Sequence, residues 1–252
     1  MHLASLRLPA FFLSAFALAA AAHATVTEKF SQTHPLAADG VVALDSVNGS
    51  VEIVGWDKNE VSIEAEKIAS DADGLKRIEI VVDASPTRVA IKTKLEKKWF
   101  SLSFRRAEVR YKLHVPVRAA LKKIDVVNAD VTVRGVQGYV DLDSVNGSID
   151  AEGLASGGRF DTVNGSIRAA FAKLSSGDRI VLDTVNGSCT AIVPAAAAFT
   201  LKADSVNGSI SCDFPITIGK SGRHHLTGSV NGGGAEIVLD SVNGGLTVRG
   251  AN

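Results

Sequence analysis

Apolar and polar positions alternate along the segment from Trp56 to Arg118. In its first stretch, Val61, Ile63 and Ala65 are separated by charged or hydroxyl residues. A two-residue period places successive side chains on opposite faces of the backbone, which is typical of half-buried antiparallel strands. The same period recurs at residues 78–82, 89–91 and 109–115.

A second pattern is an eight-residue motif, LDSVNGSV at Leu44–Val51, that returns through the rest of the chain. Its consensus is D-[ST]-V-N-G-S followed by alternating apolar residues, although Ala129 replaces the glycine of one copy and the copy at Asn231 lacks the Asp. From Asn128 onward the copies are 18, 18, 22, 21, 24 and 12 residues apart, a period typical of solenoids. The aligned asparagines are Asn48, Asn128, Asn146, Asn164, Asn186, Asn207, Asn231 and Asn243.

The Asn-Gly pair in the motif predicts a tight turn, because both residues tolerate positive φ. A two-residue hairpin is disfavoured, since in Tyr139–Gly153 it would pair Asp143 with Asp150 and leave apolar residues on both faces. A corner between two strands of a coil instead allows one shared interior. The residues expected to face that interior are Val140, Leu142, Val145, Ile149 and Ala151.

We therefore predict an all-β fold, a β-solenoid (β-helix) whose coils stack about 4.8 Å apart. In this interpretation the consensus Val fills the core, Asn and Gly form the corner, and Asp and Ser or Thr hydrogen-bond the exposed turn. Stacked Asn side chains can bond one another along the solenoid, and we favour this structural role over a ligand-binding one. The predicted ladder comprises Asn48, Asn146, Asn164, Asn186, Asn207, Asn231 and Asn243.

Three segments are expected. Residues 1–24 have the features of a secretory signal peptide: Arg7, an apolar run at Phe11–Ala22 and a small-residue cleavage site, AHA. Residues 25–120 form an N-terminal β segment that contains the first motif copy and covers the open end of the solenoid. Residues 121–252 hold the remaining coils. The apolar run is too short to span a bilayer comfortably, so we predict an exported protein in the periplasm, with the cell surface or secretion as alternatives.

The signal, the stretches WDKNEVSIEAEK (56–67) and YKLHVP (111–116), and the VNGSI units resemble the bacterial putative-adhesin family of exported β-strand-repeat proteins. The resemblance covers nearly all of the chain after residue 24. It implies a β-solenoid at the cell envelope and, by the family's name, adhesion. It supplies no catalytic residues.

Charge is balanced overall, with 27 basic and 27 acidic residues, and loss of Arg7 with the signal would leave −1. Nucleic acid is therefore not an expected partner. A local basic and aromatic segment, Lys92–Lys112, could contact anionic glycolipid, a phosphate-bearing polymer or a membrane interface. The alternative is two strands with solvated basic faces and aromatics in the core. The candidate patch is Lys97, Lys98, Trp99, Phe100, Phe104, Arg105 and Arg106.

An Asp lies three residues before most of the motif asparagines, so a solenoid would stack these carboxylates in a column. Calcium between coils would relieve their repulsion. We favour capping of backbone N–H groups at each corner, because the glycine-rich nonapeptide of calcium-binding rolls is absent. No metal or cofactor is expected. The residues are Asp45, Asp125, Asp143, Asp161, Asp183, Asp204 and Asp240.

Nothing in the sequence forms a catalytic motif, and His34, His114, His224 and His225 stand outside any metal or nucleophile pattern. Cys189 and Cys212 could form a disulfide in an oxidising compartment. Stacking of neighbouring coils would separate their Cα atoms by about 8 Å, beyond the ~7 Å limit, which favours two free thiols.

The predicted function is a non-enzymatic interaction scaffold at the envelope or surface, whose partner is an envelope component, a glycan, a membrane surface or a protein. One alternative is an envelope-stress accessory protein that binds anionic membrane or glycolipid. The other is a polysaccharide-active β-helix enzyme.

Overall fold

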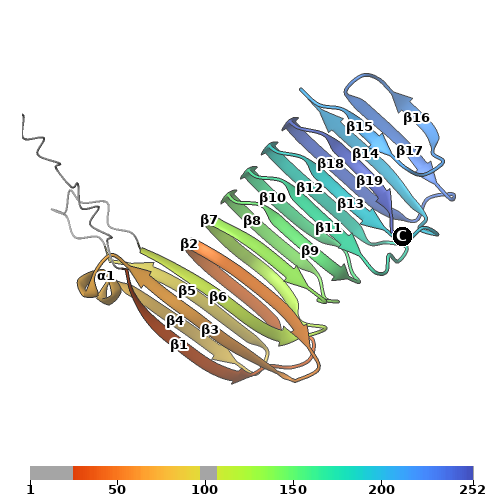
Figure 1. Cartoon of the computed structure of the whole chain (residues 1–252). Helices are drawn as coiled ribbons and strands as arrows, with labels where there is room; N and C mark the ends of the chain where they lie inside the picture. The colour runs from red at the N-terminus through yellow and green to blue at the C-terminus, as the bar shows by residue number, and fades with distance from the viewer. Residues whose placement is uncertain (1–24, 97–106, 252) are drawn as a thin grey trace, which may run out of the picture.

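The computed structural model describes residues 25–96 and 107–251. This part of the chain contains nineteen strands and one short helix, α1 (Ala72–Lys76). The strands stack along one long axis in an elongated body (Figure 1). The predicted all-β solenoid is confirmed.

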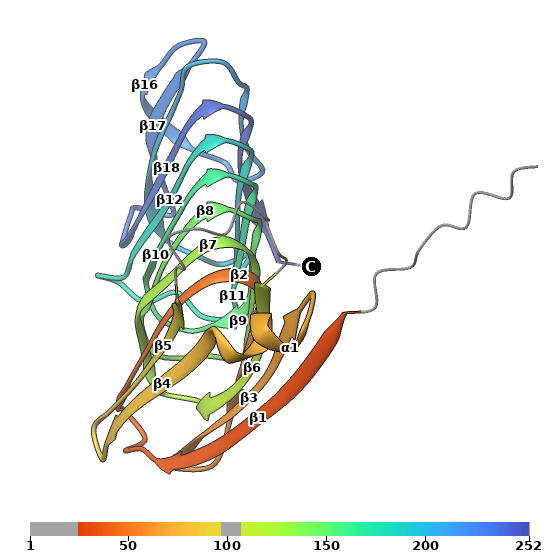
Figure 2. The same cartoon turned by 90° about the vertical axis from the view of Figure 1, so that its left-hand side faces the viewer.

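A typical coil consists of two strands joined by an Asn-Gly corner. In one coil these are β8 (Val140–Asn146) and β9 (Ile149–Leu154), and in the next β10 (Gly158–Asn164) and β11 (Ile167–Phe171). Strands β8 and β10 pair in parallel, as do β9 and β11, so that Asn146 lies opposite Asn164 and Ile149 opposite Ile167. The motif therefore forms a corner rather than a hairpin, and the core lies between the two flanks of the stack (Figure 2).

We call the strands that precede each corner the first sheet and those that follow it the second sheet. Two long strands, β2 (Val41–Trp56) and β7 (Ala120–Arg134), bend through the corner and belong to both sheets. After β10 and β11 comes the coil of β12 (Arg179–Asn186) and β13 (Cys189–Val193).

At the N-terminal end, β5 (Arg88–Leu95) and β6 (Ala107–Pro116) pair in parallel with the two halves of β2 and so form a coil without the motif. Beyond them the pairing becomes antiparallel: β4 (Ile78–Ser85) lies on β5, β3 (Glu60–Ala69) on β6, and β1 (Val26–Pro35) on β3. The alternating pattern correctly predicted β3, β4, β5 and β6 but not β1, and the parallel contacts of β5 and β6 follow from their place in a coil.

At the other end, the coils leave chain order. The last coil, β18 (Ala235–Asn243) and β19 (Leu246–Gly250), lies between β12–β13 and the coil formed by β14 (Phe199–Ser205) and β15 (Ile210–Cys212). Strand β17 (His225–Val230) then pairs antiparallel with β14, and β16 (Thr217–Ser221) pairs with β17 at the edge of the first sheet.

The prediction that the consensus Val fills the core is wrong. Val145 is 41% exposed, whereas the neighbouring Ser144 is 5% exposed. The strand continues straight to the Asn and bends only at the glycine, so strict alternation turns Leu142 and Ser144 inward and Asp143 and Val145 outward. The hydroxyl residue, expected on the exposed turn, is the one that enters the core.

Candidate interaction surfaces

A continuous chain of amide hydrogen bonds, the Asn ladder, runs along the corners. Each bond joins Nδ2 of one Asn to Oδ1 of the Asn in the adjacent coil, at 2.7–3.0 Å. At its N-terminal end Asn48 donates to the Ala107 carbonyl at 3.1 Å. The order of the ladder follows the order of the coils: Asn48, Asn128, Asn146, Asn164, Asn186, Asn243, Asn207.

Six of the seven predicted asparagines lie in this ladder, Asn128 joins it although it was not in the predicted set, and Asn231 does not belong to it. That residue precedes β18, has φ of 50° and donates from Nδ2 to the Ala197 carbonyl. The Val-Asn-Gly sequence at this position is the same as in the motif, but no Asp lies three residues before the Asn. The turn formed here is of a different kind.

Glycine is required at the corner by the closeness of the next coil. A Cβ on Gly165 would lie 2.1 Å from the Gly147 carbonyl oxygen, and one on Gly187 would lie 1.9 Å from that of Gly165. The buried hydroxyls use the same oxygens: Thr162 donates to the Gly147 carbonyl at 3.1 Å, and Thr184 to that of Gly165 at 3.0 Å. The Gly and Ser or Thr of the motif therefore form one interlocking unit between successive coils.

The consensus valines form an exposed stripe on the first sheet, which we call the valine column. Its members are 38–60% exposed and occupy successive coils between the Asp positions and the Asn ladder. An aligned apolar stripe that reaches solvent is a feature typical of contact surfaces. The column consists of Val127, Val145, Val163, Val185, Val242 and Val206.

The seven motif aspartates also align, and their column lies beside the valine column on the first sheet. Register continues the column into Lys92 at one end and His225 at the other. Lys92 Nζ lies 2.7 Å from Asp45, and His225 Nδ1 lies 2.5 Å from Asp204. Neither residue belongs to a motif copy, so the motif does not predict that they lie at the ends of the Asp column.

The expected capping of backbone N–H groups by these aspartates is not found in the described residues. Instead, cationic side chains on the same sheet contact some of them, as Arg159 does at 2.6 Å from Asp161. Each of these Asp residues lies within its strand, three residues before the Asn of the corner. Its carboxylate therefore points away from the backbone N–H groups of the corner.

Burial raises the pKa of Asp161 to about 6, and the neighbouring Asp143 and Asp183 add to the rise while Arg159 opposes it. The pKa of Asp240 is also raised, by burial first and then by Asp183 and Asp204. No group of three or more His, Cys, Asp or Glu side chains arranged to hold a metal occurs within residues 25–96 and 107–251.

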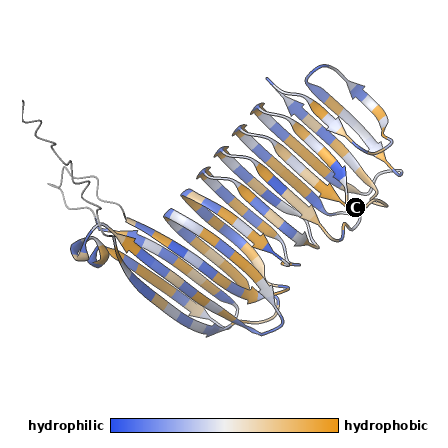
Figure 3. Cartoon of the chain, in the orientation of Figure 1, coloured by the Kyte–Doolittle hydropathy of each residue, from blue (hydrophilic) through white to orange (hydrophobic). Residues whose placement is uncertain are grey.

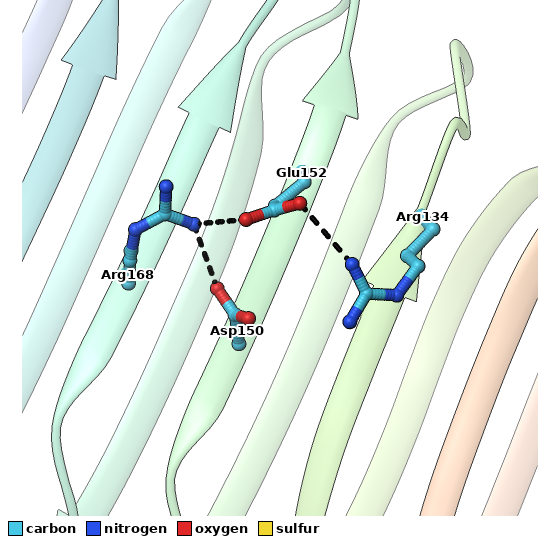
Figure 4. A network of polar contacts seen from close by, with 4 residues as sticks. All are labelled: Arg134, Asp150, Glu152 and Arg168. Carbon is cyan, nitrogen blue, oxygen red and sulfur yellow. Dashed lines mark hydrogen bonds and ion pairs between the residues drawn. The ribbon is translucent and has the colours of Figure 1, made fainter.

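Exposed charges of the second sheet also form ion pairs with one another. Arg168 contacts Asp150 at 2.9 Å and Glu152 at 2.5 Å, and Arg134 contacts Glu152 at 3.2 Å (Figure 4).

Near the N-terminal end of this sheet lies a shallow groove of about 550 Å³. Its charged lining residues are Lys29, Glu52, Glu64, Glu66, Arg110 and Lys112.

A family model described as "Toastrack DUF4097" matches residues 42–249. The chain belongs to the Toastrack DUF4097 family. No curated protein matches the sequence.

Solved structures similar to this Toastrack chain are of low sequence identity. A putative cell adhesion protein from Clostridium sporogenes is 10% identical, with a TM-score of 0.47, and the match covers 89% of this chain and all (100%) of that one. A putative adhesin from Bacteroides fragilis is 11% identical, with a TM-score of 0.42 and coverage of 89% and 97%.

The predicted basic and aromatic patch at residues 97–106 lies outside the described residues. The strands before and after it in the sequence are β5 and β6, which pair with the halves of β2 before and after its corner. Flanking cations are already engaged: Lys92 with Asp45, Lys94 with Glu79 at 3.6 Å, and Arg110 with Glu108 at 3.0 Å.

Cys189 and Cys212 are free thiols. They are farther apart than neighbouring coils would place them, because β19 lies between β13 and β15. Burial raises the pKa of Cys189 to about 12.

Among the described residues, no helix is both long and apolar enough to cross a bilayer.

Proposed function

We propose that this Toastrack protein is an exported, non-catalytic scaffold that makes multivalent contacts at the cell envelope through its first sheet. The observation that carries the proposal is the uninterrupted alignment of the valine column beside the Asp column and the Asn ladder. Export is supported by the signal-like sequence of residues 1–24, and cell fractionation with an antibody to the protein would test it.

The alignment supports multivalent contact for a geometric reason. Exposed valines recur at about 4.8 Å along the axis, so the six members of the column present a stripe roughly 24 Å long. Each single contact is weak, but the binding free energies of several contacts on one rigid scaffold combine. Once the first contact has formed, it holds the next one close to its partner. The backbone pairing of every coil with its neighbours keeps this stripe straight.

The valine column can be tested separately from stability. Val145, Val163 and Val185 are about 40% exposed, so their replacement by Ser removes outward apolar surface and leaves the core intact. Burying such surface contributes roughly 25 cal/mol per Å², so we expect the triple variant to bind isolated Gram-negative envelopes at least about tenfold more weakly in a sedimentation assay.

The matched control replaces three partly exposed apolar residues of the second sheet by Ser. Val54, Ala170 and Ile192 occupy outward positions there. Envelope binding should survive in this control. Equal binding by both triple variants, or none by the parent protein, would refute the proposal.

Residues 97–106 supply a separate test of membrane contact. We propose that Trp99, Phe100, Arg105 and Arg106 add affinity for anionic bilayers. Replacing all four by Ala should reduce co-sedimentation with phosphatidylglycerol vesicles and leave the weaker binding to neutral phosphatidylcholine vesicles unchanged. Unaltered binding to the anionic vesicles would exclude this role.

A further inference from the structure

The last coil of the chain occupies a slot between two coils that are consecutive in sequence. Strands β13 and β14 are joined only by residues 194–198, yet residues 235–250 lie between their coils in both sheets. In Figure 1 the bluest strands, β18 and β19, accordingly stand inside the stack, with β14 and β15 beyond them.

Contacts on both sides of the slot are those of an ordinary coil. On the β12–β13 side, Asn243 donates to Asn186 at 2.8 Å and Ser241 donates to the Gly187 carbonyl at 3.1 Å. On the β14–β15 side, Asn207 donates to Asn243 at 3.0 Å. The inward side chains are fully buried, and they are Ala235, Ile237, Leu239, Leu246 and Val248. Colouring by hydropathy shows the same alternation in this coil as in its neighbours (Figure 3).

The slot also selects for glycine at its corner. A Cβ on Gly244 would lie 1.7 Å from the Gly187 carbonyl oxygen. Ser205 donates to the Gly244 carbonyl at 3.2 Å, so the occupant must also present that oxygen to the next coil. The slot therefore recognises a polypeptide with the D-[ST]-V-N-G corner and apolar residues alternating on both flanks.

The occupant enters through a hinge. Four successive residues before β18 have positive φ: Asn231 at 50°, Gly232 at 82°, Gly233 at 83° and Gly234 at 157°. Glycine adopts these angles without steric cost and gives a short connection freedom to change direction.

We propose that this slot is a coil-binding site that a second copy of the chain can fill, so that two molecules join by exchanging residues 235–250. Every hydrogen bond and buried contact of the coil is the same in the exchanged pair, because the donor sequence is identical. Only the course of the hinge differs. Such an exchange of identical elements is a low-cost route to a dimer. This inference is independent of the proposed binding by the first sheet.

The test uses the full chain with a specific protease site inserted between Gly232 and Gly233. After folding, the hinge is cut, and the protein is unfolded and refolded with excess fluorescent peptide spanning residues 233–252. We expect the refolded protein to carry the labelled peptide. A peptide with the Gly244→Val substitution should be taken up at least about tenfold less, because its side chain would overlap the Gly187 carbonyl oxygen in a close-packed site.

The uncut chain supplies the second measurement. Refolding at rising concentration should yield a growing dimer fraction by light scattering, and a mixture of two differently tagged chains should yield mixed dimers. Cutting the hinge of such a dimer should leave the two bodies free to separate. No peptide uptake would overturn the site, and uptake with monomers at every concentration would overturn exchange between copies.

Discussion

Two buried hydroxyls occupy the same motif position in adjacent coils, but their removal should affect the free energy of unfolding differently. Removal of one should lower it, and removal of the other should leave it unchanged or raise it. Thr162 is 4% exposed and donates to the Gly147 carbonyl at 3.1 Å. Ser144 is 5% exposed, and its Oγ has no hydrogen-bond partner. The coil beneath Ser144 is the continuous strand β7, where Ala129 replaces the motif glycine.

The magnitudes follow from what each substitution leaves behind. Thr162→Val keeps the side-chain shape but removes the donor to the part-buried Gly147 carbonyl, which costs about 1–2 kcal/mol. Ser144→Ala removes a buried hydroxyl that makes no hydrogen bond. The free energy of unfolding should therefore stay unchanged or rise by up to about 1 kcal/mol. For a chain of this size, the loss at Thr162 corresponds to a fall in Tm of roughly 3–6 °C.

Urea titration followed by far-UV circular dichroism measures both variants against the parent protein. The midpoint should fall for Thr162→Val and should not fall for Ser144→Ala. Thr184→Val is the matched control, because Thr184 makes the same bond to Gly165 at 3.0 Å. Equal destabilisation at Ser144 and Thr162 would refute the reasoning that bonds between coils, and not packing alone, fix the hydroxyl.

Three further outcomes are expected. Gly165→Ala should lower the free energy of unfolding, measured by urea titration, by about 2 kcal/mol or more, because the Cβ would lie 2.1 Å from the Gly147 carbonyl oxygen; a variant as stable as the parent would contradict the close stacking. Asn186→Ala should cost about 1 kcal/mol in the same titration and Asn207→Ala about half, since two ladder bonds are lost at Asn186 and one at Asn207; equal losses would contradict a continuous ladder. The pKa of Asp161, raised to about 6 against its ordinary value of 3.8, means that the folded protein holds this proton more tightly. Stability should therefore rise as pH falls from 7 towards 4.5, by about 1 kcal/mol after solvent screening, and thermal melts of Asp161→Asn should show a weaker rise.

Periodicity alone identified the solenoid, because the Asn-Gly corner and its alternating flanks leave only one arrangement with a dry interior. The direction of Val145 and Ser144 was mispredicted for a local reason. The motif does not show whether the chain bends before or after Asn, and a shift of one residue exchanges the two faces of a strand. A hydroxyl in the core becomes reasonable only when the carbonyl of the next coil is seen.

The order of the coils could not be predicted from the sequence. Copies at Asn207 and Asn243 have nearly the same motif, so either could stack on the copy at Asn186 with similar contacts. The choice depends on the hinge at 231–234 and on the antiparallel strand β17, which occupies the outer side of β14. The ends of the Asp column were missed for a related reason: Lys92 and His225 reach it by strand pairing, not by sequence similarity.

Insertion of the last coil has a consequence for synthesis of the protein. A solenoid whose coils follow chain order can lengthen one coil at a time as the chain emerges from the ribosome. Here residues 199–212 obtain their native neighbour only after residues 235–250 have been made. Residues 235–250, which are made after residues 199–212, thus complete this part of the stack, and a chain terminated before residue 235 loses the native contacts of two coils instead of one.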